Sequence, residues 1–192
     1  NLSASVEKNQ ARCSNIRNAA MRLLGLVDEY LSDDRMSEAP SVLRLAPCDL
    51  QDILTNLLAE FPQGRFAFAQ KAAKEIVSDA SLLRIALRNL LANADRYAPQ
   101  HDVIQISMSE EKNFLYLDVA NQGEYIEPVE QDRLFQKYYR GPNAQHRPGA
   151  GLGLYLVSRI AKQLGGAVRL IKAGGQDLVC FRLSLPFEPG DS

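Results

Sequence analysis

The sequence predicts an α/β protein, a two-layer sandwich in which a mixed, mainly antiparallel sheet packs against about three helices, preceded by a long amphipathic helix. Apolar residues recur at three- and four-residue spacing in several separate stretches, which is typical of helices that bury one face. Apolar and polar residues alternate in two pairs of segments joined by short polar turns, which predicts antiparallel hairpins. Helical and strand patterns are interleaved along the chain, and no internal repeat is visible.

The first 40 residues predict a helical segment followed by a linker. A narrow apolar seam runs through about residues 2–36. Such a seam favours packing against another helix, against a second copy of itself, or on its own domain. Polar residues and Pro40 then interrupt the pattern. We therefore expect one unit over residues 1–40 and a larger one over 41–192. The seam consists of Ile16, Ala20, Leu23, Leu24, Val27, Tyr30 and Leu31.

Residues 41–192 predict alternating strands and helices. Asp49 is a suitable N-cap for the first helix, and Pro99 ends the second. Gly165 and Gly166 end the third. A long polar stretch, 121–150, carries one aromatic island. The predicted helices are 50–61, 81–97 and 151–164, and the predicted strands are 43–46, 65–70, 75–77, 103–109, 114–120, 167–172 and 177–186.

Composition excludes several classes of protein. The chain has 192 residues, and its 22 Lys and Arg balance 23 Asp and Glu. This balance argues against a dedicated nucleic-acid binder, which needs a basic surface. No stretch approaches the roughly 18 consecutive apolar residues of a membrane helix, and residues 1–10 lack the apolar core of a signal peptide. Cys13, Cys48 and Cys180 form no C-x-x-C pair, which argues against a zinc site and favours the reducing cytosol.

The second predicted helix places four polar side chains on one face. Asn89 and Asn93 are four residues apart, and Arg96 and Tyr97 follow three and four residues after Asn93. An amide oxygen suits Mg²⁺ and a guanidinium suits phosphate oxygens. A solvated helix face with accidental Asn residues would show the same pattern. The opposite face is the expected core, with Leu83, Leu87, Leu90, Leu91 and Ala94.

Three further segments carry candidate chemistry. The segment Gly149-Ala-Gly-Leu-Gly-Leu154 opens a helix, where backbone N–H groups favour an anion. It is neither a Walker loop nor a convincing Rossmann fingerprint. Residues 119–126 end a strand with a polar side chain and a tight turn, which could bind the edge and face of a base. The aromatic island, residues 134–141, contains consecutive aromatics, which suit a lid, a docking surface or a small satellite core.

In combination, these segments resemble the ATP-binding catalytic domain of bacterial two-component sensor histidine kinases, within the superfamily that includes gyrase, Hsp90 and MutL. The resemblance covers about residues 43–186. The N-terminal segment, 21–31, is similar to the second helix of the dimerisation and phosphotransfer hairpin. The matching motifs are Val77-Ser-Asp79 with Asn89–Tyr97 for the N box, Asn121–Ile126 for the first glycine box, Leu134–Arg140 for the F box and Gly149–Leu154 for the second glycine box.

The resemblance implies that the domain binds ATP and Mg²⁺ and transfers the γ-phosphoryl group to a histidine. Asn93 would bind Mg²⁺, and Asn89, Asn93 and Arg96 would be the catalytic residues. The implied partners are a response regulator receiver domain and the dimerisation hairpin of the parent chain or of a homodimer partner. The fragment would contact no membrane and would lie in the cytoplasm, as part of a membrane sensor. The implied nucleotide-binding residues are Asn89, Asn93, Arg96, Tyr97, Asn121, Gly123, Ile126, Arg140, Gly149, Gly151, Leu152, Gly153 and Leu154.

The sequence departs from the family pattern in two places. Asn121 stands where the family usually has an adenine-reading Asp, and Tyr125 replaces the usual second glycine. An amide accepts from the adenine amine more weakly than a carboxylate, by roughly 1 kcal/mol. However, Asn-x-Gly-x-x-Ile is similar to the variant found in heavy-metal-responsive sensor kinases.

A larger departure is the missing phosphoacceptor. His101 and His146 are the only histidines, and neither lies on a helix before a carboxylate. We therefore expect a fragment whose acceptor histidine lies elsewhere. The alternatives are a degenerate pocket that serves as a dimerisation or docking scaffold, and an ATPase or serine kinase of the same superfamily. Hydrolysis is disfavoured because Asn89 stands where those ATPases place a glutamate base.

Overall fold

The computed structural model describes residues 43–70, 75–124, 126–144, 149–172 and 178–188. The chain divides into two units, 1–42 and 43–192. The predicted amphipathic helix falls outside the described residues, so this helix and the expected boundary at residue 40 stay predictions. Among the described residues, no helix has the length and apolar character needed to cross a membrane.

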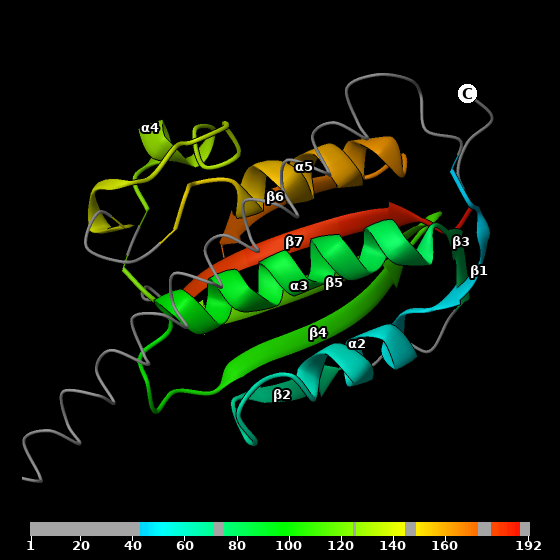
Figure 1. Cartoon of the computed structure of the whole chain (residues 1–192), viewed down its shortest axis with the longest axis horizontal. Coiled ribbons are helices and arrows are strands. Elements are labelled where there is room, and N and C mark those ends of the chain that lie inside the picture. The colour runs from blue at the N-terminus through cyan, green and yellow to red at the C-terminus, as the bar shows by residue number, and fades with distance from the viewer. Residues whose placement is uncertain (1–42, 71–74, 125, 145–148, 173–177, 189–192) are drawn as a thin grey trace, which may run out of the picture. The chain divides into compact units, whose positions relative to one another are not determined.

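Five strands form the main sheet, in the order β2-β4-β5-β7-β6 (Figure 1). Strand β2 pairs with β4 in parallel, and every other neighbouring pair is antiparallel. The mixed, mainly antiparallel sheet confirms the predicted fold class. The strands are β2 (Phe66–Gln70), β4 (Ile104–Glu111), β5 (Phe114–Gln122), β6 (Ala167–Lys172) and β7 (Leu178–Pro186).

A separate two-stranded sheet joins β1 (Ala46–Asp49) to β3 (Glu75–Ser78). The strand predicted at 43–46 was wrong, because the pairing begins where that segment ends and continues through Pro47. Proline is tolerated here because Pro47 lies opposite Val77, whose N–H donates instead to Phe187 O at 2.8 Å. The missing N–H of Pro47 therefore breaks no ladder bond.

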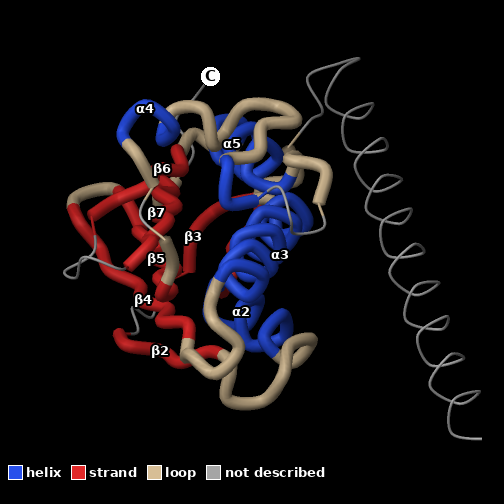
Figure 2. The backbone as a smooth tube through the Cα atoms, turned by 90° about the vertical axis from the view of Figure 1, so that its left-hand side faces the viewer, coloured by secondary structure: helices blue, strands red, loops and turns tan. Residues whose placement is uncertain are grey.

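Three helices cover one face of the main sheet (Figure 2). They are α2 (Leu50–Leu58), α3 (Ala80–Tyr97) and α5 (Gly153–Gln163). The segment predicted as one long loop also contains a short helix, α4 (Pro128–Gln131), and a 3₁₀ turn at Pro142–Ala144. Proline at the first helical position suits α4, because its fixed φ is already helical and it lacks only an N–H that would have no partner in the helix.

The core lies between this helical layer and the sheet. Every core residue predicted on α3 is fully buried, which confirms the predicted inward face. Residues one position apart on the strands alternate between the core and the other face, so Leu115, Leu117 and Val119 face the helices. The buried side chains of α3 are Leu83, Ala86, Leu87, Leu90, Leu91 and Ala94.

Capping residues fix where the helices begin and end. Asp49 Oδ1 accepts from the backbone N–H groups of Gln51 and Asp52, as predicted. Asp79 caps α3 in the same way, and its other oxygen accepts from Arg44 N at 3.0 Å. After α5, Gly165 adopts φ +77°, and the N–H of Gly166 donates to Ala161 O at 2.7 Å. This is a Schellman motif, which requires a left-handed residue.

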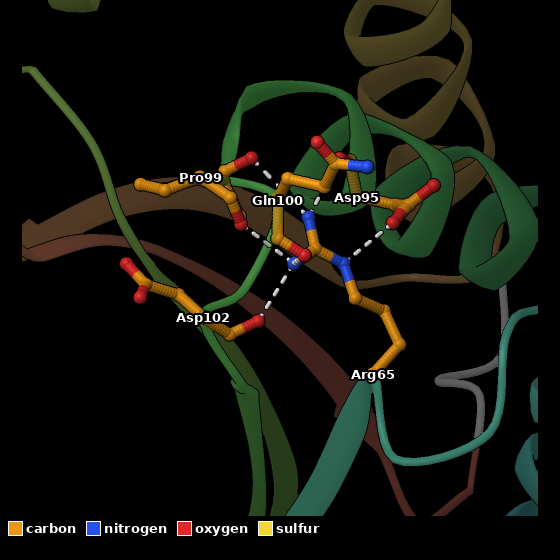
Figure 3. A network of polar contacts seen from close by, with 6 residues as sticks. Arg65, Asp95, Pro99, Gln100 and Asp102 are labelled. Atoms are coloured by element: carbon orange, nitrogen blue, oxygen red, sulfur yellow. Dashed lines mark hydrogen bonds and ion pairs between the residues drawn. The ribbon is translucent and has the colours of Figure 1, made fainter.

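Arg65, which is 9% exposed, caps the other end of α3 (Figure 3). Helix α3 ends without a left-handed glycine, because Ala98 precedes Pro99 and is extended, with ψ 144°. The last carbonyls therefore need another donor. The guanidinium of Arg65 supplies it: Nε donates to Asp95 Oδ1 (2.7 Å), Nη2 to Asp95 O (3.0 Å) and Ala98 O (3.2 Å), and Nη1 to Pro99 O (2.7 Å), Gln100 O (3.2 Å) and Asp102 O (2.7 Å).

The sheet face turned away from the helices carries a bidentate ion pair. Arg182 and Asp118 are directly opposite on β7 and β5, and both of their hydrogen bonds are 2.7 Å long. Arg182 also lies over the ring of Tyr116. Burial first, then the Asp118 charge, raises the pKa of the neighbouring Cys180 thiol to about 12. Cys180 is therefore protonated at neutral pH and is a poor nucleophile.

Candidate nucleotide site

The polar face of α3 presents an amide oxygen in a defined orientation. Asn89 is half-buried, and its Nδ2 donates to Ile85 O at 2.9 Å. A backbone carbonyl can only accept, so the nitrogen must face Ile85 and Oδ1 is directed elsewhere. Oδ1 lies 3.1 Å from the position that a Cβ on Gly153 would occupy. The amide oxygen of Asn89 therefore faces the first residue of α5.

The glycine-rich segment lies directly against this face. A Cβ on Gly149 would be 2.9 Å from Nη1 of Arg96, so the guanidinium lies beside the glycine backbone. As described above, Gly153 lies against Asn89 on the same face of α3. The structure thus brings together Asn89, Arg96, Gly149 and Gly153, four of the residues predicted for the site. Figure 1 places α4 and the start of α5 at the same end of the domain.

Gly151 fixes the middle of this segment on the aromatic island. Its φ is +77°, and a Cβ there would be 2.7 Å from both Tyr138 C and Tyr139 O. Both atoms belong to backbone, which cannot swing aside. Tyr138 itself has φ +66°, a conformation that is uncommon for a bulky residue. The two segments therefore fit together through the backbone, at a position where only glycine is accommodated.

The start of α5 suits an anion. Leu152 is the N-cap residue and offers no side-chain hydrogen bond to the first turn. The first backbone N–H groups of a helix lack partners within the helix and carry partial positive charge. Leu152 is buried, and Leu154 packs against the core, so their side chains anchor the start of the helix, and their predicted contact with the nucleotide stays a prediction.

Asn121 ends β5 as a buried polar residue. It is 2% exposed, and its Nδ2 donates to Gln122 O at 2.8 Å. The nitrogen is again assigned by its carbonyl partner, so Oδ1 is the atom left to accept from a ligand. A Cβ on Gly123 would be 3.2 Å from this Nδ2 and 3.1 Å from Val179 Cγ2. A side chain at position 123 would therefore crowd Asn121 and Val179, and glycine leaves the narrow space beside Asn121 open.

The aromatic island divides into buried and exposed parts. Phe135 packs against the core and meets the Phe181 ring edge-on, with centroids 6.3 Å apart. Tyr139 donates to Glu130 Oε1 at 3.1 Å, and burial together with this bond raises the pKa of its phenol. Tyr138 is 64% exposed. The alternatives of a satellite core and an exposed surface thus each describe part of the segment.

The remaining predicted residues lie on α3 and in the connection between β5 and α5. Asn93 and Tyr97 are half-buried on α3, in sequence positions that share the face of Asn89. Ile126 is half-buried, and its carbonyl accepts from Gln131 Nε2 at 3.1 Å. Arg140 donates to Ala144 O through Nη2. These observations do not themselves join the four residues to the glycine segment, so their place in the site stays a prediction.

The donor set fits a magnesium ion that arrives with phosphate oxygens. Within the described ranges, no three His, Cys, Asp or Glu side chains cluster as a self-sufficient metal site. The oriented amide oxygen of Asn89 lies beside the glycine segment instead. Mg²⁺ prefers oxygen ligands and is often bound by few protein groups together with substrate phosphates. The sequence favoured Asn93 as the metal ligand, and that assignment stays a prediction.

Sequence reasoning missed Arg65 and the pair Tyr139–Glu130. Arg65 is 30 to 37 residues from its acceptors, so no local pattern reveals the contact. One signal was present: Pro99 and the lack of a glycine after Tyr97 leave the carbonyls of α3 without a local cap.

An oriented amide, a guanidinium and a glycine-rich helix start on a two-layer sandwich define a nucleotide-binding domain. A family model described as "Histidine kinase-, DNA gyrase B-, and HSP90-like ATPase" matches residues 78–189. This match covers more than half of the chain, and the chain belongs to that family. The resemblance stated from the sequence is thereby confirmed.

The chain is also similar to individual sensor kinases and their structures. It is 29% identical to the sensor histidine kinase HprS of Escherichia coli K12 over an alignment of 205 positions, gaps included, and the alignment covers 96% of this chain and 44% of HprS. The chain therefore spans less than half of that relative. Full-length ShkA in complex with AMPPNP has a TM-score of 0.76 at 25% identity, covering 95% of this chain and 40% of ShkA. Histidine kinase ThkA, in complex with response regulator protein TrrA, has a TM-score of 0.73 at 20% identity, covering 92% of this chain and 51% of that one.

Proposed function

We propose that this chain is the catalytic part of a sensor histidine kinase, which binds Mg-ATP and transfers its γ-phosphoryl group to a histidine outside the chain. One observation carries the proposal: Gly149 and Gly153 lie against Arg96 and Asn89, so the glycine segment, the amide and the guanidinium converge. These groups are suited to polyphosphate and its metal ion. The ATP analogue bound to ShkA supports ATP as the nucleotide.

Each group has a role in this proposal. Asn121 Oδ1 accepts from the exocyclic amine of adenine, and Arg96 and the α5 N–H groups bind phosphate oxygens. Asn89 and Asn93 would hold Mg²⁺, which would neutralise phosphate charge. The transferred phosphoryl group leaves the β-phosphate oxygen and forms a bond to an imidazole nitrogen. The domain contributes by positioning and by charge complementarity, which dominate phosphoryl transfer.

The acceptor histidine and the partners belong to the rest of the parent protein. His101 is exposed in the turn that follows α3, and His146 lies outside the described residues. We propose the dimerisation hairpin as the source of the acceptor and a receiver domain as the next partner. The complex of ThkA with TrrA supports that choice. The proposed location is the cytoplasmic side of a membrane sensor.

Asn93→Ala is expected to weaken Mg-ATP binding about tenfold or more, because the lost amide oxygen interacts with charged groups. Isothermal titration of the wild-type chain should give saturable binding in the micromolar to low-millimolar range. Asn56→Ala, at an exposed position of α2, is the matched control and should bind like wild type. A folded wild-type chain that binds no Mg-ATP would contradict the proposal and favour the scaffold alternative.

Asn121→Leu is expected to weaken Mg-ATP binding about tenfold, because the base then loses its acceptor. The wild-type chain should prefer Mg-ATP to Mg-GTP, since O6 of guanine presents an acceptor where the adenine amine presents a donor. Competition titrations with both nucleotides measure this preference. Asn121→Leu should reduce it, and an unchanged preference would show that Asn121 does not read the base.

A further inference from the structure

We infer that Arg65 is a positioning residue of the nucleotide site, which acts by fixing the last turn of α3 so that Arg96 stays against Gly149. The inference rests on the proposed function, in which Arg96 binds phosphate. Arg65 itself bonds the C-terminal end of α3 at Asp95, and it contacts neither Gly149 nor Asn89 in the interactions described above.

The first step is the double contact with residue 95. Arg65 Nε bonds the carboxylate of Asp95 at 2.7 Å, and Arg65 Nη2 bonds the backbone carbonyl of the same residue at 3.0 Å (Figure 3). Side chain and main chain of one residue are therefore both fixed by one guanidinium. Such a bond pair restricts rotation of the helix end as well as its fraying.

The second step is that Arg96 follows immediately. Its peptide nitrogen is bonded to the same carbonyl carbon that carries the Asp95 oxygen held by Arg65. One turn contains both the contact to Arg65 and the contact of Arg96 with Gly149, where Nη1 lies 2.9 Å from the position that a Cβ on the glycine would occupy. A small rotation of this turn would move the Arg96 guanidinium relative to the glycine segment.

The third step is that nothing local replaces Arg65. Ala98 is extended before Pro99, so the helix end lacks the glycine-based cap that closes α5. The carbonyls of Ala98, Pro99 and Asp102 instead converge on the same guanidinium. Lysine has three donors on a single atom and cannot span these acceptors in a plane. The geometry therefore requires arginine rather than any cation.

A double-mutant cycle in Mg-ATP binding tests the inference. The four proteins are the wild-type chain, Arg65→Lys, Arg96→Ala and the double variant, each titrated below its melting temperature. Arg65→Lys is expected to weaken binding about tenfold, through displacement of Arg96. Arg96→Ala should then weaken binding about tenfold in the wild-type background but less than about twofold in the Arg65→Lys background, because coupled residues are not additive.

Arg182→Lys is the matched control. It breaks a bidentate pair with Asp118 on the sheet face away from α3, and so costs stability without touching the site. Its Mg-ATP affinity should stay within about twofold of wild type. If Arg65→Lys does not fold, Asp95→Asn replaces it in the same cycle, because it removes the charge of the ion pair and keeps the carbonyl bonds.

The outcomes are distinguishable. Coupled effects in the cycle, with an unaffected Arg182→Lys control, support the inference. Effects of Arg65→Lys and Arg96→Ala that simply multiply, or an Arg65→Lys variant that binds like wild type, overturn it and leave the proposed function intact. A folded wild-type chain that fails to bind Mg-ATP overturns the proposed function and this inference together.

Discussion

Gly151→Ala is expected to weaken Mg-ATP binding about a hundredfold, because the glycine segment can no longer lie on the aromatic island. The added Cβ would be 2.7 Å from Tyr138 C and Tyr139 O, and the residue must also keep φ +77°. The left-handed conformation alone costs an alanine about 1 kcal/mol. The segment would have to move away, and with it Gly149 and Gly153, which lie against Arg96 and Asn89.

Nucleotide titration and thermal unfolding separate this effect from unfolding. The substitution lies outside the main core, so the melting temperature should change by only about 2–4 °C. Gly141→Ala is the matched control, because it lies in the same connection and its Cβ would be 4.0 Å from Glu130 Oε1. That variant should bind like wild type. If Gly151→Ala bound Mg-ATP as well as Gly141→Ala does, contact with the aromatic island would not be needed for binding.

Gly166→Ala is expected to lower the free energy of unfolding by about 3 kcal/mol, the largest stability effect that we predict for a single methyl group. Its Cβ would be 2.0 Å from Ser184 O and 3.0 Å from Ser184 C. These are backbone atoms of β7, at the place where β6 begins its pairing with Ser184. The added methyl group must therefore separate two neighbouring strands or displace the end of α5.

Gly165→Ala gives the comparison that identifies the cause. Gly165 has φ +77°, but its Cβ would be 3.4 Å from Pro186 Cγ, an ordinary contact. Its cost is therefore backbone conformation alone, about 1 kcal/mol. Urea unfolding of both variants, with equal m-values, measures the difference. A smaller loss for Gly166→Ala than for Gly165→Ala would mean that β6 and β7 tolerate the separation.

The parts of the fold that follow from local patterns were predictable. Leu83, Leu87 and Leu90 recur at helical spacing, and the structure buries all three. Asp49 was predicted as a cap because its chemistry satisfies N–H groups only two and three residues away. Strand β1 was misplaced because Pro47 is unfavourable in most strands, and only its pairing with Val77, set by distant residues, makes it acceptable.

The candidate site was predictable by composition and order but not by contact. Asn89 and Asn93 share a helix face by spacing alone, yet nothing local indicates that Gly153 lies on Asn89 and Gly149 on Arg96. The parallel pairing of β2 with β4 likewise joins strands separated by α3. Arg65 shows the limit most clearly, because its acceptors become neighbours only when α3 and the start of β4 are both in place.

The order of the strands also determines which connection of this domain can differ in length. The central neighbours β5 and β7 pair over their whole lengths, although α5, β6 and the glycine segment lie between them in sequence. The connection from Gln122 to Gly153 therefore joins two elements whose ends are fixed by the sheet and the helical layer. The entropy of closing a flexible connection grows only with the logarithm of its length, about 0.6 kcal/mol for each doubling. The sheet can thus carry connections of very different lengths at this end, and the geometry beside the proposed nucleotide site can vary while the scaffold stays the same.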